Sequence, residues 1–201
     1  MQDTSNNISG HHFKQKNLAF ETTKSVALAG TISAAAFYAL MGVFRGSVPS
    51  TQMLAQSATF GAAVGALFGH GKYSKTKIFN HKAEALNKYQ SNAMIQDDIL
   101  YQVGGMDYQY HRGKAESLFS NVNITSFVGG FAYDALRRSD RPSAVSSLLN
   151  ATTSLSAVGW VASHVLGMNH AVKDEKKQLL FAEKVALERA SETTAAQLRL
   201  M

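Results

Sequence analysis

Charged residues are spread unevenly along this chain, and four long stretches contain none of them. The uncharged stretches are 20, 26, 17 and 31 residues long, at residues 25–44, 46–71, 117–133 and 142–172. A helix that crosses a bilayer needs about 20 predominantly apolar residues. The pattern therefore predicts an all-α membrane protein, with four transmembrane helices in two tandem hairpins at residues 24–70 and 117–167. The spans are expected at residues 24–44, 51–70, 118–136 and 144–167.

Polar segments flank the two predicted hairpins. An N-terminal arm covers residues 1–23, a connector covers 71–116, and a charged tail covers 168–201. The connector contains NHKAEALNKYQSNAMIQDDILYQV, which we expect to be helical up to the helix-breaking pair Gly104–Gly105. The tail alternates apolar and charged residues, a pattern that predicts a surface helix.

The overall composition leaves a second fold open. Charged residues make up 17% of the chain, and the mean hydropathy is −0.11, which a helical bundle in water also reaches. Uncharged runs of this length are uncommon in water-soluble helices, and they favour the membrane interpretation.

Small residues recur at helical spacing within the predicted spans. Each glycine inside a water-soluble helix lowers its stability by about 1 kcal/mol relative to alanine. Residues four apart share one helix face, and small side chains there let two helix backbones approach closely. We therefore expect helix packing through three small-residue sets: Ser57, Gly61, Gly65 and Gly69; Gly129 and Gly130; and Gly159, Ser163 and Gly167.

The two hairpins have the features of an internal duplication. A shift of 93 residues aligns Arg45 with Arg138 and Pro49 with Pro142, and it also pairs the serines that follow the prolines. Because the Arg-x-x-x-Pro-Ser match falls at the same place in both hairpins, the sequence predicts a repeated helix–turn–helix unit.

Charges at the ends of the predicted spans allow two interpretations. The formal net charge of the chain is +6. An acid three or four residues before an arginine forms a helical ion pair, whereas clustered arginines bind phospholipid headgroups such as those of cardiolipin. Both alternatives remain open for Arg45, Asp134, Arg137, Arg138 and Arg141. Basic and aromatic residues are not interleaved as on a base-stacking surface, so nucleic acid is not an expected partner.

Residue patterns for catalysis or cofactor binding are not recognisable in the sequence. The chain has no cysteine, and its seven histidines lack the spacing of a metal site. The glycine-rich runs lack the lysine and the strand–turn–helix context of a phosphate loop. We therefore expect no enzymatic activity, cofactor, metal or small-molecule substrate, and we expect the histidines to be solvated or interfacial.

Several motifs resemble the mitochondrial Tim-type inner-membrane translocase family. AAFYALMGVFRGSVP at residues 35–49 is similar to the first span and turn of that family, and SATFGAAVGALFG at 57–69 is similar to its second span. The turn ALRRSDRPSA at 135–144 also matches. The element before the third span is matched by Arg112, Lys114 and Glu116, although Glu116 replaces an aspartate and the connector of some 45 residues is longer than the family's loop.

The resemblance implies a multi-pass protein of the mitochondrial inner membrane. The family includes an accessory subunit of respiratory complex I (NADH:ubiquinone oxidoreductase) with the same four-helix form and no channel role. We therefore expect a non-catalytic subunit that stabilises neighbouring membrane subunits of this respiratory-chain assembly and contacts membrane lipids. The alternative is a component of the inner-membrane protein-import translocase.

Overall fold

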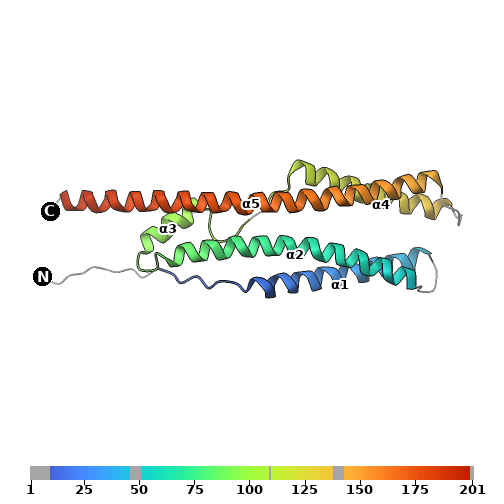
Figure 1. Cartoon of the computed structure of the whole chain (residues 1–201), viewed down its shortest axis with the longest axis horizontal. Helices are drawn as coiled ribbons and strands as arrows, with labels where there is room; N and C mark the ends of the chain where they lie inside the picture. The colour runs from blue at the N-terminus through green and yellow to red at the C-terminus, as the bar shows by residue number, and fades with distance from the viewer. Residues whose placement is uncertain (1–9, 46–50, 109, 138–142, 200–201) are drawn as a thin grey trace. The chain divides into compact units, whose positions relative to one another are not determined.

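The computed structural model describes residues 10–45, 51–108, 110–137 and 143–199 (Figure 1). These residues form five α-helices: α1 (Leu18–Arg45), α2 (Thr51–Asn87), α3 (Ala93–Gln102), α4 (Lys114–Arg137) and α5 (Ala144–Arg199). The start of α5 follows the start of α2 by 93 residues, the same offset that pairs Arg45 with Arg138 in the sequence.

The membrane prediction is corrected by the composition of these helices. In the part of the chain that the structure describes, no helix has both the length and the apolar content that a membrane crossing needs. The prediction of four transmembrane helices in an all-α membrane protein is therefore wrong. The cause is that an uncharged run is not necessarily an apolar one: seven of the 17 residues at 144–160 are serine, threonine or asparagine.

Two helices extend beyond their expected ends. Helix α2 continues through residues 71–87, which were assigned to the connector, and α5 continues without a break into the predicted tail helix. Neither junction contains a proline that would remove a backbone donor and end the helix. The single helix expected over residues 80–103 is wrong, because a turn at residues 88–91 separates α2 from α3. Its predicted stop at Gly104–Gly105 agrees with the structure, because α3 ends at Gln102 and both glycines have positive φ, 66° and 88°.

The chain divides into two compact units, each containing segments that are distant in sequence. Unit 1 comprises Met1–Glu21, Tyr73–Tyr110 and His170–Met201, and unit 2 comprises Thr22–Lys72 and His111–Asn169. Unit 2 thus holds the two predicted hairpins, whereas unit 1 combines the arm, most of the connector and the tail.

Unit 1 has an ordinary apolar core at the junction of α2, α3 and α5. Asn92 caps α3 by accepting a hydrogen bond from the Ile95 N–H, which fixes the start of the short helix. The core residues are Ala85, Leu86, Ile95, Ile99, Val103, Leu179, Ala182 and Ala186.

A buried lysine ties these elements together. Lys82 on α2 is 1% exposed. Its Nζ donates to the main-chain oxygens of Val103 and Gly105 at 3.2 and 2.9 Å, and it lies 3.5 Å from Oε2 of Glu175 on α5. A buried ammonium is tolerated only where such acceptors replace its hydration shell.

Unit 2 has the opposite distribution of side chains. Of its large apolar residues in the described segments, Met168 alone is fully buried. The other buried side chains are small or polar, including Ser57, Glu116, Ser120, Ser126, Ser146 and Ser156. Large apolar side chains face outward instead: Leu28, Ile32, Phe68, Leu118, Ile124, Val128, Leu148, Leu155, Val158 and Leu166 are all more than half exposed.

Candidate functional site: a buried Glu116–His164 pair in a polar helix seam

Helices α4 and α5 are joined by polar side chains. Asn123 Nδ2 donates to the main-chain oxygen of Thr153 at 2.7 Å and to Ser156 Oγ at 3.3 Å. The Thr153 hydroxyl lies 2.9 Å from that of Ser126. We call Asn123, Ser126, Thr153 and Ser156 the polar seam. Because its hydrogen bonds are directional, the seam fixes the register of α4 against α5.

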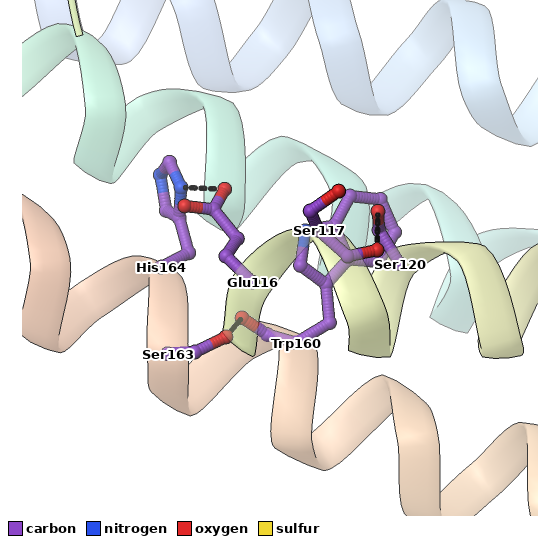
Figure 2. Close-up of polar contacts among 6 residues, drawn as sticks. All are labelled: Glu116, Ser117, Ser120, Trp160, Ser163 and His164. Carbon is purple, nitrogen blue, oxygen red and sulfur yellow. Dashed lines mark hydrogen bonds and ion pairs between the residues drawn. The ribbon is translucent and has the colours of Figure 1, made fainter. Parts of the chain in front are cut away.

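A carboxylate–imidazole pair extends this α4–α5 contact. Glu116 on α4 is 3% exposed, and its Oε1 lies 2.9 Å from Nδ1 of His164 on α5. Figure 2 shows the two side chains pointing toward each other from the two helices. A buried carboxylate is expensive to desolvate unless it is paired and hydrogen-bonded, so His164 makes the burial of Glu116 tolerable.

A second histidine, His70, lies beside this pair. The rings of His70 and His164 are 6.1 Å apart between centroids and inclined at 70°. Burial lowers the pKa of His70 below its ordinary value, and the neighbouring His164 lowers it further. Gly71 lies next to this arrangement, and a Cβ there would make an ordinary van der Waals contact, 3.4 Å, with His164 Nε2.

The hydroxyl groups around the pair donate hydrogen bonds to main-chain carbonyls of their own helices. Ser163 Oγ donates to the Trp160 carbonyl at 3.0 Å, and Ser120 Oγ donates to the Ser117 carbonyl at 3.1 Å (Figure 2). In the described part of the chain, no group of three or more histidine, aspartate or glutamate residues is arranged to hold a metal ion. The geometry of these described residues fits a polar clamp between helices.

The predicted glycine face of α2 lies against α1. A Cβ added at Gly61 would lie 2.5 Å from the Gly30 carbonyl oxygen, and one at Gly65 would lie 2.8 Å from the Val26 oxygen. A Cβ at Gly69 would meet the Val26 side chain, and Ser57 is buried on the same helix. The backbones of α1 and α2 therefore approach closely where the side chains are smallest.

The predicted packing residues of α4 and α5 have unequal surroundings. A Cβ at Gly159 would lie 2.6 Å from the Phe119 ring, and one at Gly130 would lie 3.4 Å from Leu149 Cβ. Among the described residues, no atom outside its chain neighbours and its own helix backbone lies within 4 Å of a Cβ at Gly129. Gly167 and Ser163 are half-buried on α5.

The remaining predicted residues lie apart from one another. Arg112 and Lys114 are exposed at the start of α4, whereas Glu116 is buried. Arg138 and Arg141 lie outside the described residues, and so do the side chains of Arg45, Asp134 and Arg137, whose backbones are helical. The structure thus brings one residue of the family-like motif, Glu116, into the candidate site.

Sequence reasoning missed His164 as the partner of Glu116. The expectation that the histidines are solvated or interfacial is wrong for His164, whose side chain is 17% exposed. The available signal was its position inside the uncharged stretch 142–172, where a polar ring needs a partner if it is buried.

Comparison with known proteins gives no relative for this fold or site. No family model, curated protein or solved structure matches the chain.

Proposed function

We propose that this chain is a non-catalytic structural subunit that stabilises a larger protein assembly. Its outward-facing apolar side chains in unit 2 would pack against apolar helices of neighbouring subunits. The observation that carries the proposal is the distribution of side chains in that unit, where small and polar residues are inside and large apolar residues are outside.

Helix α5 carries large apolar side chains that are exposed. Leu148 and Leu155 are 68% and 74% exposed and lie seven residues apart, so they project from one face of the helix. Burial of a leucine side chain contributes about 1.5–3 kcal/mol. Contiguous apolar surface larger than a few hundred Å² is rare on monomeric proteins and marks an interaction surface. A partner that covers these side chains would therefore stabilise the unit.

The polar seam supports a structural role in a different way. Its hydroxyl and amide groups, and the Glu116–His164 pair, are used to join α4 to α5. Polar contacts inside the unit leave the apolar side chains available for contacts with other proteins.

We also propose the identity of the assembly, on the resemblance of residues 35–49 and 57–69 alone. Mitochondrial respiratory complex I is the first candidate, and the inner-membrane protein-import translocase is the second. This proposal does not include a multi-pass arrangement in the membrane, because that arrangement depended on the four spans that the structure contradicts.

The test compares two leucine substitutions on the same helix. Leu155→Glu changes the proposed contact face, and Leu198→Glu makes the same change at a residue that is 70% exposed in unit 1. Both tagged full-length variants should retain the wild-type helical circular dichroism. Leu155→Glu should reduce the recovery of co-purifying proteins about tenfold, because it places a charge in an apolar contact. Leu198→Glu should leave that recovery unchanged.

Native gel electrophoresis then identifies the assembly. Co-migration with respiratory complex I supports the first candidate, and co-migration with the import translocase supports the second. Absence from both assemblies eliminates both identities. Equal recovery of partners with the two leucine variants, or migration of the full chain as a compact monomer, would refute the structural-subunit proposal itself.

A further inference from the structure

The N-terminal arm of unit 1, residues 10–17, is held by side-chain amides along its backbone. Asn87 on α2 accepts from the Phe13 N–H and donates to the Phe13 carbonyl, both at 2.9 Å. Asn80 makes the same two bonds with Lys16, both at 2.8 Å. Gln96 on α3 does so with His11 at 2.8 and 2.9 Å. We call Asn80, Asn87 and Gln96 the amide ladder; the arm lies beside this part of α2 in Figure 1.

The spacing of the ladder matches an extended chain. Asn80 and Asn87 are seven residues apart on α2, which corresponds to about 10.5 Å along a helix axis. Phe13 and Lys16 are three residues apart, which corresponds to about 9 Å in an extended chain of the polyproline II type, whose three-residue period turns both residues to the same side. Because the two lengths are similar, side-chain amides on one face of α2 can bond both the N–H and the carbonyl of residues three apart in an extended peptide.

At one end of the ladder the amide also bonds to a residue outside the arm. Gln96 is 1% exposed, and its Nε2 also donates to the Leu86 carbonyl at 2.8 Å, which orients the amide. The Gly10 N–H donates to the Gln90 carbonyl at 2.9 Å beside it. A Cβ at Gly10 would collide with the Gln96 side chain, so the absence of a side chain at Gly10 lets the arm lie this close to the amide.

Two side chains of the arm add chemical selectivity to these main-chain contacts. Phe13 packs against the apolar core of unit 1. Lys16 Nζ lies 3.8 Å from the centroid of the Phe79 ring, a cation–π contact. The surface therefore fits an extended segment that has an aromatic residue followed, three positions later, by a basic residue.

We propose that the amide ladder is a binding site for an extended peptide segment of a partner protein, with the pattern aromatic-x-x-basic. The chain's own arm is the resident competitor. Most of its contacts use main-chain atoms that every peptide has, so another segment can replace it. A tethered segment acts at a millimolar effective concentration, so the arm sets a threshold that the partner must exceed.

The first test uses modified peptides as probes. A fluorescent peptide with the sequence of residues 8–18 is titrated into the full chain carrying Phe13→Ala and Lys16→Ala, which weaken the resident arm. N-methylation at the Phe13 position removes the donor to Asn87 and should weaken binding about tenfold. N-methylation at the Lys14 position is the matched control, because that N–H donates no hydrogen bond within the described residues.

The second test changes the protein. Binding to the arm-weakened chain should be about tenfold tighter than binding to the wild type, and addition of Asn87→Asp should reverse the gain. Asn169→Ala, at an exposed asparagine in unit 2, is the control and should have no effect. Thermal melts verify that every variant is folded.

Hydrogen exchange on the wild-type chain provides a readout that needs no substitution. The amides of His11, Phe13 and Lys16 should be protected, while those of His12, Lys14 and Gln15 should exchange at rates near those of a free peptide. Equal effects of the two N-methyl peptides, or uniform exchange along the arm, would overturn the proposal. Dimerisation that Asn87→Asp abolishes would assign the site to a second copy of the chain and would also overturn it.

Discussion

The glycine contact between α1 and α2 gives a prediction in which two physical effects have opposite signs. Replacement of a helical glycine by alanine stabilises an exposed helix by about 1 kcal/mol through helix propensity. At Gly61 the new Cβ would lie 2.5 Å from the Gly30 carbonyl oxygen and 2.6 Å from Ala34 Cβ. Backbone must then move, and overpacking of this kind costs about 1–3 kcal/mol.

Gly129 supplies the matched control in the same unit. It is also helical, but no described atom outside its own stretch of helix lies within 4 Å of a Cβ at that position. We therefore expect Gly129→Ala to show the propensity gain alone, up to about 1 kcal/mol. Gly61→Ala should show a net loss of up to about 2 kcal/mol, because the packing cost offsets the gain and can exceed it.

Thermal unfolding of the full chain, followed by circular dichroism, measures the difference. For a chain of this size 1 kcal/mol corresponds to about 2–4 °C in Tm. The midpoint should fall by up to about 8 °C for Gly61→Ala and rise by about 2–4 °C for Gly129→Ala. If Gly61→Ala raised the Tm as much as Gly129→Ala, the close approach of the two helix backbones would be refuted.

The candidate site gives two further predictions. His164→Ala leaves the buried Glu116 carboxylate without its imidazole and should lower the free energy of unfolding in urea by about 3 kcal/mol; Glu116→Gln in the same chain should restore part of that loss, and no restoration would contradict the pairing. The pKa of His70 is lowered in the folded chain, so the unfolded chain takes up a proton at this residue at a higher pH than the folded chain does. The free energy of unfolding should therefore fall as the pH drops below 6.5, until the folded-state pKa is passed. Urea midpoints between pH 8 and pH 5 measure this slope, which should become shallower in His70→Gln, and an unchanged slope would contradict the assignment.

The helical content and the end of α3 were predictable from local patterns, whereas the ends of α2 and α5 were not. The end of α3 before Gly104 follows from glycine chemistry, which acts within a few residues. The membrane assignment failed because it counted charges and gave too little weight to the hydroxyl and amide side chains. In α5 those side chains supply the polar seam, which the absence of charge does not reveal.

The sites depend on residues that are far apart in sequence. Glu116 and His164 are separated by 48 positions, and Asn87 and Phe13 by 74. An asparagine on a helix that pairs with a distant backbone looks, in the sequence, like any solvated asparagine. The Gly61 and Gly65 spacing could be recognised because a stripe of small residues is periodic within one helix, although the sequence did not identify Gly30 as its partner.

The reactivity of the buried Lys82 amine can be used to measure how often unit 1 opens. Acylating reagents need an accessible, unprotonated lysine nitrogen, and this one is surrounded by two carbonyl oxygens and a carboxylate. Its rate of labelling, compared with that of the solvent-facing Lys177, should therefore follow the opening of the α2–α3–α5 junction. Mass spectrometry of labelled peptides would time that opening without any engineered probe.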